Sequence, residues 1–339
     1  MRICTLTIAL LCLAVVGLKV ADDPGTQVAL FANNFLDQLD ADQKSTVSMP
    51  YESEQRVDWH FIPKKTRKGL MLRNMNSAQR VAALRMLRSA LSEAGYGKAS
   101  KIMMLESVLR ELEGEGRTWE RDHTKYYVTI FGTPGETGTW GLSFEGHHLS
   151  MNFSFRDGAL VDSTPQFFAA NPATIMNDVS GPLGKGTRVL RDEEQLAFDL
   201  IASLQDSQRD SAIIDQDAPA EIRFAGEPQA KVEAPLGITF RELSDNSKSL
   251  LTKLVNTYVD AVADPVAAQR RAQIEEDGWD DVHFAWAGAT EPGIGHYYRV
   301  RGKRFLIEFV NTQADAAGNP ANHIHCVWRD LSGDFDLQP

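Results

Sequence analysis

Residues 140–162 read WGLSFEGHHLSMNFSFRDGALVD, and this stretch decides the fold class. Apolar and polar side chains alternate from His148 to Phe155, which is the pattern of a strand that buries one apolar face. Asp157-Gly158 then provides a strong turn signal between two extended segments. The stretch therefore predicts an antiparallel β-meander, with strands at 140–145, 148–155 and 159–162.

Outward from this stretch, the spacing of apolar residues defines the remaining elements. Helices are predicted at 26–39, 80–92, 99–113, 192–204, 244–262 and 265–276, with Gly95-Tyr96-Gly97 breaking the chain between the second and the third. Further strands are predicted at 126–131, 283–288, 296–301, 305–311 and 323–329, whereas 163–186 is rich in loop residues. The predicted fold class is α+β, with helical hairpins packed on antiparallel β-meanders.

The two halves of the chain have a similar order of predicted elements. Gly237-Ile238-Thr239-Phe240 precedes the second helical hairpin much as Gly69-Leu70-Met71-Leu72 precedes the first. Two related halves and a chance similarity of order both remain open. The predicted organisation is a signal peptide at 1–21, an N-terminal helix and extended segment at 22–68, a first hairpin, meander and following helix at 69–217, a Pro/Ala-rich linker at 218–235, and a second hairpin and meander at 236–339.

The beginning of the chain has the shape of a secretory signal peptide. Met1-Arg2 is basic, residues 3–18 are almost wholly apolar, and a polar run follows at 22–25. The apolar run is short for a membrane span, which needs about 20 residues. Gly17 and Ala21 are both small enough for a cleavage site, and the choice between them stays open. With cleavage at either, we expect a secreted or periplasmic protein that has no membrane segment after the signal peptide is removed.

The balance of charges excludes some classes of partner. The chain has 35 Lys and Arg against 46 Asp and Glu, a net charge of −11, and removal of Arg2 and Lys19 by cleavage near Ala21 makes it −13. Because nucleic acids and anionic membranes repel such a protein, neither is an expected partner. Cleavage would also leave Cys326 as the single cysteine, so no intramolecular disulfide is expected.

Four of the eight histidines lie in two tight clusters, Glu145-Gly146-His147-His148 and Asn322-His323-Ile324-His325. Residues two apart in a strand share a face, so His323 and His325 point the same way. Their spacing allows both imidazoles to bind one ion. The adjacent pair His147 and His148 should point to opposite faces, so we expect one of the two to join.

The sequence therefore predicts a possible metal site. The candidate metal ligands are His147, His148, His323 and His325. Imidazole with a carboxylate suits zinc, iron, manganese or copper. The candidate catalytic residues are Glu145, Glu308, Arg299 and Arg329. Either glutamate could be a further ligand or a general base, and the two arginines could bind an anionic ligand.

These residues support two functions of different classes. The first is a metal-dependent enzyme, hydrolytic or oxidative, acting on an unknown extracellular substrate. The second is a non-catalytic binding protein that uses the same histidine, aromatic and arginine side chains for a small or anionic ligand. A third interpretation assigns no function: each cluster is only part of the polar face of a strand.

A family resemblance rests on six segments of the chain: 67–70, 140–150, 284–288, 296–299, 305–313 and 322–330. Together they resemble a bacterial family known as domain of unknown function 3500. The resemblance covers most of the chain after the signal peptide and implies no activity, so function must come from the site. Phe309-Val310 stands where the family suggests Tyr-Asp, and Cys326 where it suggests Ser, which argues against a required thiol.

The sharpest prediction is that the two histidine clusters meet in space. Both lie at the start of a strand in a similar meander, and polar groups are costly to bury unless they are paired. We expect an imidazole nitrogen of His147 or His148 within about 8 Å of one from His323 or His325, close enough to share an ion or a water.

Overall fold

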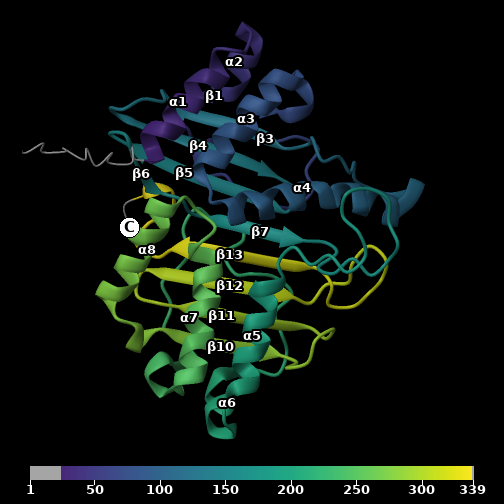
Figure 1. Cartoon of the computed structure of the whole chain (residues 1–339), viewed down its shortest axis with the longest axis vertical. Helices are drawn as coiled ribbons and strands as arrows, with labels where there is room; N and C mark the ends of the chain where they lie inside the picture. The colour runs from purple at the N-terminus through teal and green to yellow at the C-terminus, as the bar shows by residue number, and fades with distance from the viewer. Residues whose placement is uncertain (1–23, 338–339) are drawn as a thin grey trace, which may run out of the picture.

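The computed structural model describes residues 24–337, and the predicted signal peptide lies outside them. The described strands form one 13-stranded sheet, whose main path runs β1-β3-β4-β5-β7-β13-β12-β11-β10-β8 (Figure 1). Only β1 and β8 pair in parallel with their neighbours, so the sheet is mostly antiparallel. The predicted α+β class is confirmed.

The strands of the meanders lie close to their predicted positions. The first half contains β1 (Ser48–Met49), β2 (Leu70–Met71), β3 (Tyr127–Gly132), β4 (Thr139–Gly146), β5 (Leu149–Arg156), β6 (Ala159–Asp162) and β7 (Gln166–Ala170). The second contains β8 (Ile213–Asp215), β9 (Ile238–Thr239), β10 (His283–Gly288), β11 (His296–Arg301), β12 (Phe305–Asn311) and β13 (Ile324–Asp330).

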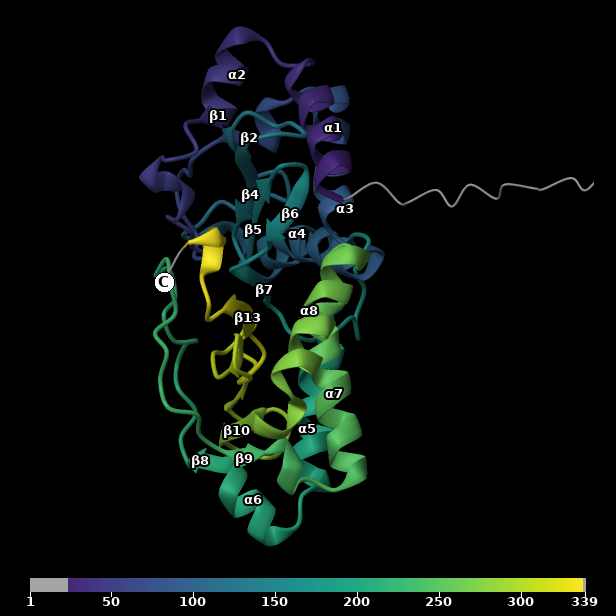
Figure 2. The same ribbon diagram turned by 90° about the vertical axis from the view of Figure 1, so that its left-hand side faces the viewer.

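Helices cover one face of the sheet, and loops cover the other (Figure 2). The α-helices are α1 (Pro24–Leu36), α2 (Ala41–Val47), α3 (Ser77–Ala90), α4 (Glu93–Glu113), α5 (Arg191–Ser203), α6 (Asp206–Ala212), α7 (Asp245–Val259) and α8 (Asp264–Asp277). Short 3-10 helices are η1 (Glu54–Arg56), η2 (Leu72–Asn74), η3 (Gly114–Gly116), η4 (Phe240–Glu242), η5 (Trp279–Asp281) and η6 (Asp334–Asp336). No helix among these residues is long and apolar enough to cross a membrane.

Helix α4 corrects one sequence expectation. Gly95-Tyr96-Gly97 was expected to break the chain, but α4 begins at Glu93 and runs through both glycines. Ser92 caps the helix because its side chain accepts a hydrogen bond from the backbone N–H of Gly95. Gly95 also approaches the backbone of Ala261, where a Cβ would clash at 1.8 Å. The first glycine therefore serves close packing.

The largest correction concerns β7, which lies in the segment expected to be a loop. This strand pairs with β5 on one side and with β13 on the other, so it joins the two halves into one sheet. All five of its residues are buried, so its sequence QFFAA has no alternation of polar and apolar side chains. A short run buried on both faces leaves no periodic signal.

The alternation in β5 is confirmed by its burial. Its apolar residues pack into the main core on the helical side of the sheet, and these are Leu149, Met151, Phe153 and Phe155. Ser150, Asn152 and Ser154 are buried too, beneath the loops of the opposite face. The polar face of β5 is therefore covered by loops and is not exposed to solvent.

The predicted linker packs against the sheet. Residues 218–235, named the strap from here on, run along the loop-covered face (Figure 2), and Ile222 and Ala230 are buried there. The order of elements is also similar in the two halves, since α1-α2-β1 and α5-α6-β8 each precede a short strand, a 3-10 helix and a helical hairpin. A common origin of the halves stays a prediction.

Candidate metal centre

The turn between β4 and β5 fixes His148. His147 and His148 form this turn, and His148 has a φ of 65°, in the left-handed region that residues with a Cβ rarely adopt. Its backbone is held on both sides, because its N–H donates to the carbonyl of Phe61 and its carbonyl accepts from the N–H of Ala169, each at 2.9 Å. The fold therefore imposes one position on this side chain.

The second histidine cluster reaches the same place through β7. His325 lies on β13 directly opposite Ala169 of β7, the residue whose N–H binds the carbonyl of His148. His323 precedes β13, and its own N–H donates to the side chain of Asn311 at 2.9 Å. Strand β7 thus brings together residues that are 175 positions apart in the sequence.

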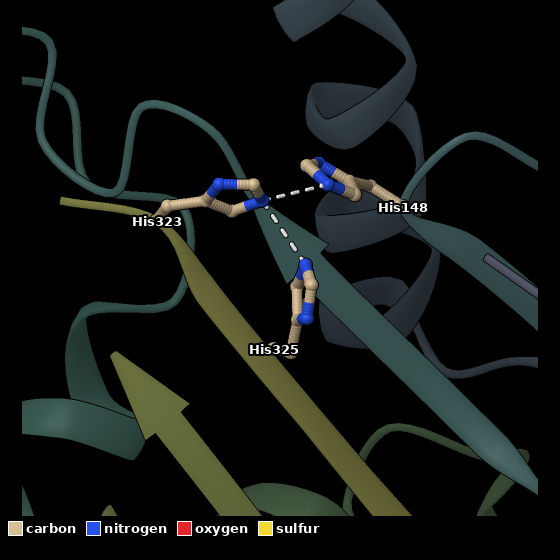
Figure 3. Close-up of side chains that lie close together, drawn as sticks. All are labelled: His148, His323 and His325. Atoms are coloured by element: carbon tan, nitrogen blue, oxygen red, sulfur yellow. Dashed lines mark hydrogen bonds between the residues drawn. The ribbon is translucent and has the colours of Figure 1, made fainter. Parts of the chain in front are cut away.

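Three imidazoles point at one another (Figure 3). The Nε2 atom of His323 lies 2.9 Å from Nε2 of His148 and 3.0 Å from Nε2 of His325. Ligand atoms of all three lie within 4.8 Å of one another, so the group could hold a metal ion. The prediction that the two clusters meet is confirmed.

The far side of two rings is held by polar side chains. Nδ1 of His325 lies 2.8 Å from both carboxylate oxygens of Glu221. A carboxylate accepts a hydrogen bond, so Nδ1 of His325 carries a proton and Nε2 is the ring nitrogen that faces the other histidines. Nδ1 of His323 lies 3.3 Å from the amide nitrogen of Asn171, and the amide oxygen of Asn171 has no partner among the described residues. If the amide group is turned by 180°, its oxygen accepts a hydrogen bond from Nδ1–H of His323.

Burial favours the neutral form of His148 and His323. It lowers the pKa of His148 well below its ordinary value, and the neighbouring histidines add to this effect. Burial, followed by the charge that His325 would carry, lowers the pKa of His323 to about 2. Because a metal ion needs the unprotonated imidazole nitrogen, these rings are in the ligand form at neutral pH.

His147 is not one of the three, which corrects its assignment as a metal ligand. Its Nδ1 lies 2.5 Å from Glu106 and 3.1 Å from Arg121, and its ring stacks on His148 with centroids 3.7 Å apart. As expected for adjacent residues, only one of the pair joins the group. The turn directs the ring of His147 toward Glu106 on α4 instead.

The two glutamates expected at the metal lie in ion pairs elsewhere. Glu145 contacts Lys68 at 2.9 Å and Arg67 at 3.8 Å. Glu308 accepts hydrogen bonds from Arg223 at 2.9 Å and from the hydroxyl of Tyr297 at 2.6 Å. Both carboxylates are buried, and a buried carboxylate needs a cation close by, which the covering loops supply.

The two arginines are also away from the histidines. Arg329 binds Asp334 at 2.8 Å and donates to the carbonyls of Phe224 and Glu227 in the strap. The nearest carboxylate of Arg299 is Glu233, at 4.0 Å. Arg329 therefore holds the strap in place, because strand alternation turns it to the covered face some distance along β13 from His325.

Sequence reasoning missed the residues that support the histidines. Glu221 lies in the strap, whose composition indicated only a linker, and Glu106 lies on α4 among residues of the helical pattern. Asn171 follows β7, the strand that was itself not predicted. The one sequence signal that could have identified Glu221 is weak: it is a charged residue within a Pro/Ala-rich segment.

Loss of the Glu221 carboxylate should weaken metal binding. We expect Glu221→Ala to lower zinc affinity by about 10- to 100-fold, because His325 loses the group that fixes its tautomer and its ring orientation. Glu221→Gln keeps an oxygen acceptor and should fall between this variant and the unaltered protein. Competition with a chromogenic chelator measures both, and equal affinities for all three proteins would contradict the assigned role.

Fold and site together define the class of protein: an α+β protein with one continuous sheet and a group of three histidines that could hold a metal ion. The chain belongs to the family described as protein of unknown function DUF3500, whose model matches residues 21–337. No curated protein and no solved structure matches it. The family description names no activity, so the geometry of the three histidines is the basis for a function.

Proposed function

We propose that this protein is an exported zinc-dependent hydrolase whose metal ligands are His148, His323 and His325. The observation that carries the proposal is the convergence of three Nε2 atoms, with neighbouring separations of 2.9 and 3.0 Å. Three histidines with a fourth position left for water or substrate are a ligand set of catalytic zinc.

Two of the three separations between ligand nitrogens fit an ion of this size with small adjustments. A zinc–nitrogen distance of about 2.0–2.1 Å corresponds to about 3.3 Å between nitrogens in a tetrahedral site. The two short separations would open by a few tenths of an ångström, which small rotations of the imidazole rings provide. The third pair, within 4.8 Å, would close by a larger amount.

The ligand set also favours some metals over others. Imidazole nitrogen suits zinc and copper, whereas manganese prefers oxygen ligands. The carboxylates nearest in sequence, Glu145 and Glu308, are already paired with cations. We therefore favour zinc, with copper and an oxidative reaction as the second choice.

The chain's own residues would prepare this centre for hydrolysis. Zinc supplies a Lewis acid and lowers the pKa of bound water to about 7. Glu221 orients His325, and the rings of Phe61 and Phe167 pack against that imidazole, with centroids 4.9 and 5.7 Å away. These aromatic contacts exclude water from one side of the site, which strengthens electrostatic interactions within it.

Export is the other part of the proposal. It rests on the signal-peptide pattern of the first residues and is supported by the family model, which begins at residue 21. The secreted or periplasmic location, and with it the extracellular substrate, therefore depends on cleavage of the signal peptide near that residue. Mass spectrometry of the protein from its native host would identify the mature N-terminus.

One observation favours the alternative of a non-catalytic binding protein. His148 and His325 are each only 4% exposed, which limits the access of a large substrate to the ion. In that case the same centre would hold its metal or ligand without turnover. Small hydrolysable probes avoid this restriction and can separate the two functions.

Elemental analysis and hydrolysis assays test the proposal together. We expect about one zinc per chain in the native protein, and metal-dependent hydrolysis of 4-nitrophenyl acetate that is lost on chelation and restored by zinc. Stoichiometric zinc without turnover of ester, phosphate or glycoside probes favours the binding protein, and stoichiometric copper favours oxidation. Absence of any bound metal after reconstitution would overturn the metal centre itself.

A further inference from the structure

A cavity lies directly behind His147, on the side away from the three metal ligands. It has a volume of about 20 Å³, opens to solvent, and lies between the loop at 63–67, helix α4 and the start of β3. About 10–15 Å³ of such space holds one water molecule, so this cavity has room for the charged group of a small ligand whose remainder stays at the mouth.

The charges that line the cavity reverse the balance of the whole chain. Acidic residues outnumber basic ones by 46 to 35 overall, but the cavity is lined by four cations, Lys64, Arg67, Arg121 and Lys125, and by two carboxylates, Glu106 and Glu120. A local excess of positive charge in an acidic protein attracts anions specifically to that place.

Not all of these cations are neutralised by neighbours. Lys64 has no ion pair among residues 24–337. Arg67 donates to two backbone carbonyls, and its nearest carboxylate, Glu145 at 3.8 Å, is already paired with Lys68 at 2.9 Å. Arg121 is paired through two hydrogen bonds to Glu113. Lys125 lies 3.5 Å from Glu120, but that carboxylate also pairs with Arg73 at 2.8 Å. Positive charge is therefore available to a ligand.

A buried hydroxyl in the cavity wall also lacks a partner. Tyr127 is 4% exposed, and its hydroxyl forms no hydrogen bond within the described part of the chain. Buried polar atoms are almost always paired, so an unpartnered one indicates a missing water or ligand. Trp119 adds a flat, half-buried apolar surface to the same wall.

We propose that this cavity binds a small organic anion through a carboxylate or phosphate group. Lys64, Arg67 and Lys125 supply the positive charge, the Tyr127 hydroxyl donates a hydrogen bond, and Trp119 packs against the apolar part of the ligand. The proposal does not require a metal ion, since all of these groups belong to the chain.

The cavity nevertheless adjoins the metal centre. His147 forms part of its wall, and the same ring stacks on His148 at a centroid distance of 3.7 Å. A ligand in the cavity would therefore lie one imidazole ring away from a metal ligand. If the centre is catalytic, the anion site is close enough to bind an acidic substrate or product.

Titration calorimetry with benzoate, phenyl phosphate and the neutral analogue benzamide tests the proposal. Metal-free and zinc-loaded protein are both measured, so that failure of the metal centre does not affect the result. We expect saturable binding of at least one of the two anions, weakened by added salt, and none of benzamide. The arms with benzoate and phenyl phosphate distinguish a carboxylate from a phosphate ligand.

Paired variants locate the binding. Lys64→Ala with Lys125→Ala should weaken anion binding by about 10-fold or more, because charge-assisted hydrogen bonds are lost. Lys248→Ala with Lys303→Ala removes the same charge far from the cavity and should leave binding unchanged. Equal weakening by both pairs, binding of benzamide as tight as that of the anions, or no saturable anion binding would each overturn the proposal.

Discussion

Replacing His148 with asparagine is expected to lower zinc affinity by on the order of 100-fold and to leave the fold intact. The free energy of zinc binding to a four-ligand site is about 10–16 kcal/mol, so one ligand accounts for about 3 kcal/mol. A tenfold change in affinity corresponds to about 1.4 kcal/mol. The affinity loss should therefore exceed that of Glu221→Ala, which changes only the support of a ligand.

Asparagine suits this position because of the backbone. His148 has a φ of 65°, and asparagine adopts the left-handed region more readily than most residues. The hydrogen bonds of its N–H to Phe61 and of its carbonyl to Ala169 involve only backbone atoms of this residue, so they survive the change. The melting temperature should stay close to that of the unaltered protein.

Two histidine variants serve as matched controls for zinc titration. His147→Asn changes the adjacent ring, which binds Glu106 and is not a ligand, and His123→Asn changes an exposed histidine near the same end of the sheet. Both should keep zinc affinity within about tenfold, the lower limit for support residues. If His147→Asn lost the metal and His148→Asn kept it, the ligand assignment would be wrong.

The largest expected effect on stability comes from Asp334→Ala. Its carboxylate is 0% exposed and accepts hydrogen bonds from Arg329, which is 1% exposed, and from the backbone N–H of Asp330. Removal of one partner leaves a buried guanidinium without its counter-charge, which costs about 3–5 kcal/mol. Urea denaturation should show this loss in the free energy of unfolding.

A second variant identifies the cause of that loss. Arg329→Met together with Asp334→Ala removes both charges and should recover part of the stability, because no buried charge is left unpaired. Glu276→Ala breaks the exposed ion pair with Arg304 and should cost less than about 1 kcal/mol. A similar loss in Asp334→Ala and Glu276→Ala would mean that burial does not control the strength of these pairs.

This pair also links stability to the candidate site. Arg329 donates to the carbonyls of Phe224 and Glu227, and so it fixes the strap that carries Glu221 to His325. We therefore assign Arg329 a structural role in place of the catalytic one that its position near the histidine cluster indicated. Composition alone could not separate these roles, because a guanidinium serves both.

Much of the fold could be predicted from local sequence patterns. Alternation identified β5, because its apolar residues all pack into the core on the helical side of the sheet. Short elements were missed: α2, α6 and β7 have seven, seven and five residues, too few for a periodic pattern to stand out. Gly95 in α4 was misinterpreted, because its close approach to the backbone of Ala261 depends on a distant segment.

By itself, the sequence determined the α+β class and marked both histidine clusters, since each follows from residues close together in the chain. Tertiary structure alone decided which imidazoles meet and which acids and bases accompany them. His148 and His325 come together because β7 bonds to both the turn at His148 and strand β13. Pairing between strands this far apart depends on the burial of whole faces, and a local window of sequence does not contain that information.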